Sequence, residues 1–245
     1  MRASRYAFVL VTCGMLVAHV TSCSLGTGSG SVTGTLDVPN CWSGAFNLQP
    51  DFFAAIPYRS QVVFRVQSGG DYEAFSDGIT VLVDDVTSIR ANSLGKALDV
   101  SLPPGVVPPG APVVADPNPA PVHLSLYMQR ACRLETPALY ALRDVALNAD
   151  GSCGGPSTAP LTCADAGAST SSPTGHSTIT FTDLFDGDPD EGDVAKRRTA
   201  ATFDVYLADP RDACAASKVP PRCRGHLTGS FDFLFQRGRP SQPFP

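Results

Sequence analysis

The stretch LTGSFDFLF, residues 227–235, decides the fold class, because its apolar side chains fall mostly on alternate positions. The stretch TFDVYL, residues 202–207, repeats this alternation. Successive side chains of a β-strand point to opposite faces, so a period of two predicts half-buried strands. The pattern returns at Val32, Leu36, Val38; at Val62, Phe64, Val66; at Ile79, Val81, Val83; at Leu98, Val100, Leu102; at Leu124, Leu126, Met128; and at Ile179, Phe181.

The spacing of these stretches predicts an all-β protein. Residues 138–147 fit a helix or a strand, and the strand is favoured because the turn sequence NADG, residues 148–151, follows. About eight to ten short strands separated by loops rich in Gly, Pro and Asp favour an antiparallel β-sandwich. The motifs TGTL at 33–36 and TGSF at 228–231 are alike, so we expect both to lie in one sheet.

The cysteines of the chain predict disulfide cross-links in this fold. Six cysteines lie beyond residue 23: Cys41, Cys132, Cys153, Cys163, Cys214 and Cys223. An even number in an exported chain is typical of disulfides, and six cysteines allow 15 pairings. Proximity in the sequence favours Cys153 with Cys163 and Cys214 with Cys223, which leaves Cys41 for Cys132. We therefore expect the β-sandwich to be stapled by disulfides.

The first 22 residues are typical of a secretory signal peptide. Arg2 and Arg5 precede an apolar run of about 15 residues that ends at Val20. A membrane-spanning helix needs about 20 residues, so cleavage is favoured over a permanent span. The run ends in Val20-Thr21-Ser22-Cys23, which resembles the lipobox of bacterial lipoproteins: an aliphatic residue, two small residues and a cysteine. An ordinary cleaved signal peptide, with Cys23 unmodified, is the alternative.

The resemblance implies cleavage before Cys23, a diacylglycerol on its sulfur and an acyl chain on its new amino group. One acyl chain binds a membrane marginally, whereas two anchoring signals hold stably. In this family Asp after the cysteine favours inner-membrane retention, and this chain has Ser24. The resemblance thus implies an exported protein that is lipid-anchored in the outer membrane, on either its periplasmic or its surface face. The predicted partner is the lipid bilayer, through acylated Cys23.

The remaining 223 residues carry 16 basic and 23 acidic side chains, a net charge of −7. A nucleic-acid partner is not expected, because phosphate neutralisation needs clustered positive charge. We expect a flexible Gly/Ser tether at 23–31, one β-sandwich domain at 32–239 and a C-terminal tail at 240–245. Residues 103–121 hold eight prolines and predict a stiff connection within the domain or a linker between two domains.

An acidic segment, residues 183–193, is a candidate metal site. Its candidate ligands are Asp186, Asp188, Asp190 and Asp193. The first three resemble the start of an EF-hand-like calcium loop, but Arg197 takes the place of the bidentate glutamate. The interpretation we favour is a solvated turn that the basic residues 196–198 neutralise. No cofactor is therefore expected, with calcium as the alternative.

No catalytic motif is complete. The tetrapeptide Ser93-Leu94-Gly95-Lys96 has the Ser-x-x-Lys spacing of penicillin-recognising enzymes but lacks their companion elements, so it is interpreted as a turn. Wide spacing of His123, His176 and His226 disfavours a histidine-based site. We predict that the protein is not an enzyme. The alternative is a periplasmic hydrolase assembled from distant residues, which a serine beside a histidine, or two close acidic groups in a cleft, would favour.

An aromatic cluster follows the first of the six cysteines. Its members are Trp42, Phe46, Phe52, Phe53 and Tyr58. Exposed aromatic rings can form a sugar-stacking platform. We favour a place in the core beside a disulfide, because so many exposed rings would form an aggregation-prone patch.

Three segments beyond the leader resemble lipoproteins of outer-membrane bacteria. They are VPNCWSG at 38–44, GGD at 69–71 with SDG at 76–78, and GSFDF at 229–233. This resemblance implies no activity and no site. The expected function is a membrane-anchored lipoprotein of the cell envelope, with a non-catalytic binding or structural body and an envelope protein or glycan as partner. A calcium-dependent adhesion or carbohydrate-binding module is a further alternative.

Overall fold

The computed structural model describes residues 27–69, 76–103, 119–132, 139–154, 173–188, 190–209 and 220–236. The predicted signal peptide, Cys23, most of the proline-rich segment, Cys163, Cys214 and the tail from residue 240 lie outside the described residues. Within the described residues, no helix has the length and apolar character that crossing a membrane requires.

The described chain is built from short strands with one helix and one 3-10 turn. The elements are β1 (Thr27–Val38), β2 (Trp42–Leu48), β3 (Phe52–Tyr58), β4 (Gln61–Ser68), β5 (Asp77–Val83), α1 (Val86–Asn92), β6 (Ala97–Asp99), β7 (Val122–Met128), β8 (Leu139–Ala141), β9 (Asp144–Ala146), β10 (Thr174–His176), β11 (Thr178–Asp183), η2 (Ala195–Arg197), β12 (Arg198–Ala208) and β13 (Gly225–Leu234).

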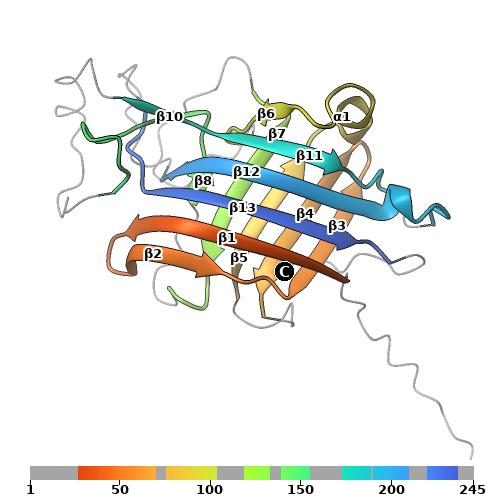
Figure 1. Ribbon diagram of the computed structural model, residues 1–245, viewed down its shortest axis with the longest axis horizontal. Coiled ribbons are helices and arrows are strands. Elements are labelled where there is room, and N and C mark those ends of the chain that lie inside the picture. The colour runs from red at the N-terminus through yellow and green to blue at the C-terminus, as the bar shows by residue number, and fades with distance from the viewer. Residues whose placement is uncertain are drawn as a thin grey trace, which may run out of the picture.

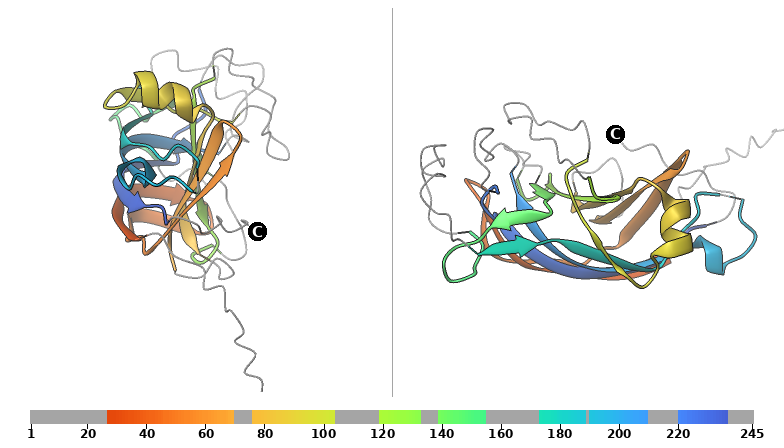
Figure 2. Two further views of the ribbon diagram at one scale, coloured as in Figure 1. Left: turned by 90° about the vertical axis from the view of Figure 1, so that its right-hand side faces the viewer. Right: turned by 90° about the horizontal axis from the view of Figure 1, so that it is seen from above.

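One antiparallel sheet contains most of these strands, in the order β2-β1-β13-β12-β8-β7-β5-β4-β3. β11 pairs with β12, and β6 pairs with β11, while β9 and β10 form a separate small sheet. The large sheet curls, so that β3, β4, β5 and β7 run steeply behind the layer of β1, β2, β11, β12 and β13 (Figure 1). Figure 2 shows the two layers from the side and from above. The predicted all-β, antiparallel class is confirmed.

The core fills the space between the two layers. The ring of Phe233 on β13 lies 5.5 Å from that of Phe53 on β3 and 5.8 Å from that of Phe64 on β4. Most of the residues that the alternation placed inside are buried, from Val32 on β1 to Phe235 after β13, whereas Leu98 and Leu102 are only half-buried. Burial of these apolar groups, at about 25 cal/mol per Å² of area removed from water, is what holds the two layers together.

Several local predictions can be compared with the structure. Residues 139–146 form the strands β8 and β9, and the turn follows them, as predicted. The expectation that the TGTL and TGSF motifs lie in one sheet is confirmed, and their strands are neighbours there, with Thr33 on β1 opposite Thr228 on β13. Of the aromatic cluster, the three phenylalanines are buried and Trp42 packs half-buried against the core, whereas Tyr58 is exposed.

The predicted tether is wrong over residues 27–31, because β1 begins at Thr27 and pairs with β13 from there. Glycines occupy the inward positions of this segment, at Gly28 and Gly30. A Cβ at Gly28 would overlap Phe233, and a Cβ at Gly30 would lie 2.8 Å from the carbonyl oxygen of Ser230. The glycines are therefore required by a close approach of β13, and their composition does not indicate a flexible coil here.

Two disulfides join distant parts of the chain. Cys41 is bonded to Cys132, as predicted. Cys153 is bonded to Cys223, so the predicted local pairings of Cys153 with Cys163 and of Cys214 with Cys223 are wrong. The physical reason is backbone pairing, since the amide of Cys223 donates to Ala146 and the amide of Gly154 donates to Cys223. These bonds bring the two cysteines together across a separation of 70 residues.

The strands on both sides of the proline-rich segment belong to the same sheet. The ends of that segment also meet, because Val100 bridges to Val122 and the amide of Ala120 donates to Ser101 Oγ at 3.0 Å. This arrangement favours a connection within one domain over a linker between two.

Candidate functional site

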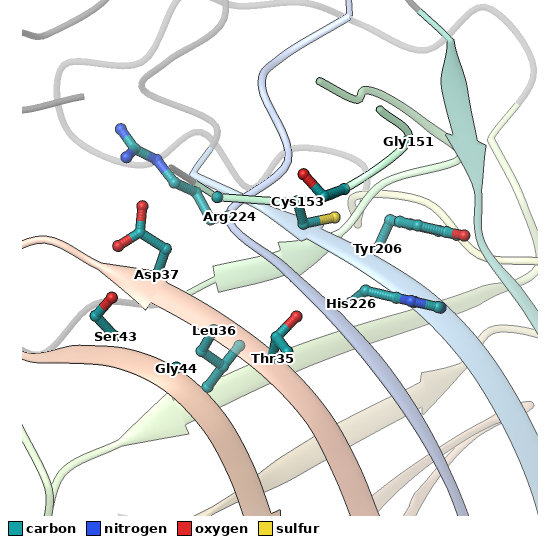
Figure 3. A pocket seen from close by; sticks show the side chains of 12 residues that line it. Thr35, Leu36, Asp37, Ser43, Gly44, Gly151, Cys153, Tyr206, Arg224 and His226 are labelled. Atoms are coloured by element: carbon teal, nitrogen blue, oxygen red, sulfur yellow. The ribbon is translucent and has the colours of Figure 1, made fainter. Parts of the chain in front are cut away.

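A pocket of about 540 Å³ opens at the rim of the front layer, where β1 ends and β13 begins (Figure 3). We call it the rim pocket. Its lining residues are Thr35, Leu36, Asp37, Ser43, Gly44, Gly151, Ser152, Cys153, Gly154, Tyr206, Arg224 and His226. The volume falls within the range of about 300–1,000 Å³ that is usual for small-ligand sites.

One end of the rim pocket is formed by side chains on the outer face of the sheet. Strand register sets His226 on β13 between Thr35 on β1 and Tyr206 on β12. The rings of His226 and Tyr206 stack in parallel, with centroids 4.2 Å apart. Nε2 of His226 lies 2.6 Å from Oδ1 of Asp204. The stack and the carboxylate together fix the imidazole in one orientation.

The other end of the rim pocket carries charge, with Asp37 and Arg224 side by side in Figure 3. The backbone of Arg224 donates to Leu207 and accepts from Asp37, each at 2.7 Å. Arg224 is therefore tied between β12 and β1, and it is only 9% exposed. The guanidinium of an arginine carries several hydrogen-bond donors in a fixed planar arrangement, which suits the recognition of polar ligands.

A loop closes the rim pocket on the side away from the sheet. Asn148 Nδ2 and Arg222 Nη2 both donate to the carbonyl oxygen of Gly154, at 2.6 Å and 3.1 Å. Gly154 has φ +78°, and a Cβ there would lie 2.8 Å from Cβ of Asp37, so only glycine fits. The Cys153–Cys223 disulfide anchors this loop to the start of β13. The pocket is consequently bounded by backbone that several independent bonds hold.

Two titratable groups of this region have shifted pKa values. The Ser152 hydroxyl and amide donate to Asp150 and lower the pKa of its carboxyl, which stays ionised beside the pocket. Burial, with Asp204 as a smaller cause, raises the pKa of the Tyr206 phenol. Tyr206 therefore remains a neutral hydrogen-bond donor at neutral pH. The pocket combines hydroxyls, one cation, one anion and an aromatic stack, which is the chemistry of binding polar molecules.

The arrangement of the histidines does not form a nucleophile with its base. His123 is buried, with Nδ1 2.9 Å from the Ser101 carbonyl oxygen and Nε2 2.9 Å from Asp84. His176 lies between Asp144 and Asp99, at 3.1 Å and 3.3 Å. Among the described residues, no serine hydroxyl hydrogen-bonds to any of the three histidines. The close pair of carboxylates around His176 does not line the rim pocket.

His176 connects three strands through its two ring nitrogens. It is on β10, whereas Asp144 is on β9 and Asp99 is on β6. Carboxylates only accept hydrogen bonds, so both ring nitrogens must be protonated to donate to both of them. The bond to Asp144, and a smaller contribution from Asp99, raise the pKa of His176. The protonated imidazole thus fastens the small β9–β10 sheet to the large one.

The four aspartates of the candidate calcium site do not converge on one point. Asp186, Asp188 and Asp193 each accept a hydrogen bond from the amide two residues further on. Asp186 also lies 3.5 Å from Arg90 of α1. In the described part of the chain, no group of three or more His, Cys, Asp or Glu side chains is placed to hold a metal ion. Ser93 to Lys96 form a turn after α1, as predicted.

Comparisons of this chain with protein-family models, with curated proteins and with solved structures find no match.

The sequence did not predict the rim pocket, because the residues that line it come from β1, β2, β12, β13 and the loop before residue 155. One signal could have indicated it. Tyr206 and His226 are outward positions of two predicted strands, where the neighbouring outward residues are Asp, Thr and Ser.

Proposed function

We propose that this chain is a lipid-anchored protein of the bacterial cell envelope whose folded body binds a hydroxyl-rich ligand, such as a segment of an envelope glycan, in the rim pocket. The body acts as a binding module and not as an enzyme. Acylated Cys23 is the anchor, and the exported location agrees with the two disulfides, which persist in oxidising compartments.

The rim pocket is the observation that carries the binding role. Its walls offer hydroxyls at Thr35, Ser43 and Ser152, and the charged groups of Asp37 and Arg224. Sugar hydroxyls both donate and accept hydrogen bonds, so they match a wall that contains donors and acceptors. Binding costs less when the site is already ordered, and here strands and a disulfide hold the walls before any ligand arrives.

A blocking substitution tests the site. The full lipidated chain in detergent micelles is presented with peptidoglycan fragments and with lipopolysaccharide core oligosaccharides, and binding is read by saturation-transfer NMR. Ser43 is exposed on β2 and lines the pocket, so Ser43→Trp is expected to fill the pocket without entering the core. Asn47 is exposed on the same face of β2 but lies outside the pocket, which makes Asn47→Trp the matched control.

The expected result is that at least one of these glycans binds, that Ser43→Trp abolishes the transfer signal and that Asn47→Trp preserves it. Equal binding by the two variants would exclude the rim pocket as the site. No binding of either glycan class would refute the proposed ligand class.

The anchor has its own test. The variant Cys23→Ser has no sulfur for the diacylglycerol, so it is expected to lose acyl labelling and to leave the membrane fraction or to stall in processing. Unchanged acyl labelling and unchanged fractionation in this variant would contradict the lipid anchor.

A further inference from the structure

The start of β1 limits how far the folded body can stand from its proposed anchor. Cys23 precedes Thr27, the first residue of β1, by four positions. An extended chain spans at most about 3.6 Å per residue, so these four positions reach about 14 Å. The pocket end of β1 is far from this point, because a strand of 12 residues rises about 3.3 Å per residue and therefore extends about 36 Å.

Four segments lie at the same end of the molecule as the start of β1 (Figure 1), and we call this part of the molecule the anchor-side end. They are the β3–β4 turn at 58–61, residues 86–96 with α1, the loop 184–197 and the end of β13. Leu234 on β13 lies opposite Thr27 and opposite Arg198, the first residue of β12. Figure 2, left, looks on to this end of the molecule.

Contacts between the segments hold the anchor-side end together. The amide of Val86 donates to the Ser60 carbonyl oxygen at 3.0 Å, which joins α1 to the β3–β4 turn. Arg90 Nη1 donates to the Leu184 carbonyl oxygen at 2.9 Å, which joins α1 to the loop 184–197. The amide of Phe235 donates to Arg197 at 2.9 Å, which joins the same loop to β13. The end is thus one continuous surface.

Three exposed hydrophobic side chains lie on this surface. Tyr58 is 59% exposed, Val194 is 53% exposed and Leu94 is 38% exposed, and no other large hydrophobic residue of the described chain is exposed to this degree. Single exposed hydrophobic residues are ordinary, but these three all lie on the anchor-side end. The guanidinium of Arg59 lies 5.2 Å above the Tyr58 ring. A tyrosine and a long cation side by side suit the interface between lipid headgroups and acyl chains.

Charge on the anchor-side end is largely compensated. Its acidic loop is paired in part, since Arg90 lies 3.5 Å from Asp186 and Lys196 lies 3.6 Å from Glu191. The surface is therefore compatible with zwitterionic lipid headgroups and does not depend on anionic ones.

We propose that the anchor-side end rests on the bilayer through Tyr58, Leu94 and Val194, and that the rim pocket opens away from the membrane. This inference rests on the lipid anchor of the proposed function. It places the binding site about one strand length from the lipid surface, where it can reach a ligand that is not part of the same membrane.

The test uses tryptophan fluorescence and brominated lipids. The chain has one tryptophan, Trp42, which lies opposite Val38 at the pocket end of β1. The full lipidated protein is reconstituted in phosphatidylethanolamine and phosphatidylcholine vesicles with and without brominated acyl chains, and vesicle flotation is recorded for each sample. The probe variant is Trp42→Phe/Tyr58→Trp, and the native protein with Trp42 is the matched control.

The expected result is strong quenching of the Tyr58→Trp probe and no quenching of Trp42, with both proteins floating. Insertion of a dozen Gly and Ser residues between Gly26 and Thr27 is expected to weaken the quenching of the probe, because a longer tether frees the body. Flotation without quenching of the probe, or with quenching of Trp42, would overturn the orientation and leave the anchor intact. Failure to float would refute the anchor itself, and the orientation with it.

Discussion

Removal of the Cys153–Cys223 disulfide tests both the fold and the rim pocket. On the chain-entropy account, a crosslink that closes a loop of 70 residues stabilises the folded state by about 4 kcal/mol. The double substitution Cys153→Ala/Cys223→Ala is therefore expected to lower the free energy of unfolding by that amount. For a domain of this size, each kcal/mol shifts the melting temperature by about 2–4 °C, so the fall is roughly 10 °C.

Single variants distinguish this pairing from the local pairings that the sequence favours. With one bond between Cys153 and Cys223, either alanine alone removes the whole crosslink, so the double variant is expected to cost no more than each single one. With two local bonds of about ten residues each, every single variant would lose roughly 2–3 kcal/mol and the losses would add. Urea unfolding of the alkylated proteins measures all three. Additive losses would refute the pairing.

The other disulfide supplies the matched control for function. Cys41 and Cys132 are separated by 91 residues, so the same account gives a similar loss, about 4–5 kcal/mol, when both are alanine. Of the four cysteines in the two described disulfides, Cys153 alone lines the rim pocket. Loss of the Cys153–Cys223 bond is thus expected to weaken glycan binding below the melting temperature, and loss of the Cys41–Cys132 bond is expected to preserve it. Equal weakening in both would show that overall stability, and not the pocket wall, controls binding.

Two further predictions address the hydrogen bonds of His176 and the first residues of β1. Asp144 first, and Asp99 second, raise the pKa of His176. The protonated imidazole therefore stabilises the fold fully below the ordinary pKa of about 6.5, and this stabilisation is lost as the pH rises through the raised pKa. Urea unfolding of the native protein and of His176→Asn is expected to differ at about pH 5.5 and to converge at about pH 9, and a constant difference would contradict this role of His176. Gly28→Val is expected to cost about 1–3 kcal/mol because its side chain meets β13, whereas Ser29→Val, on the outward face, stays within about 0.5 kcal/mol in thermal melts. Two neutral substitutions would mean that this segment is a tether after all.

Most strands of this fold could be predicted because burial imposes an alternation that is visible locally. In β4, β5 and β7 the inward positions are Val, Phe, Ile, Leu or Met, and all of them are buried. The disulfide partner of Cys153 could not be predicted in this way. It depends on where β13 lies relative to the loop 147–154, which is set by the order of strands in the sheet.

The rim pocket was beyond sequence reasoning for a related reason. Its parts become neighbours only when β1, β12 and β13 are paired in register, so that Thr35, His226 and Tyr206 form one row. Each of these residues alone is an ordinary outward residue of a strand. The contacts of the histidines could not be predicted for the same reason, because His176 and Asp99 are 77 residues apart in the sequence.

The start of β1 shows how one misjudged local pattern changes a functional conclusion. Composition suggested a coil at 27–31, since glycine is the inward residue there and hydropathy does not alternate. The glycine at position 28 is instead explained by close packing, because the Cβ and backbone of Phe233 and the carbonyl oxygen of Asp232 leave no room for a side chain there. A tether that ended at residue 31 would reach about 32 Å from Cys23 and would leave the body free to turn. With β1 beginning at Thr27 the reach from the proposed lipid anchor at Cys23 falls to about 14 Å, and we expect a body anchored that closely to present one end to the membrane.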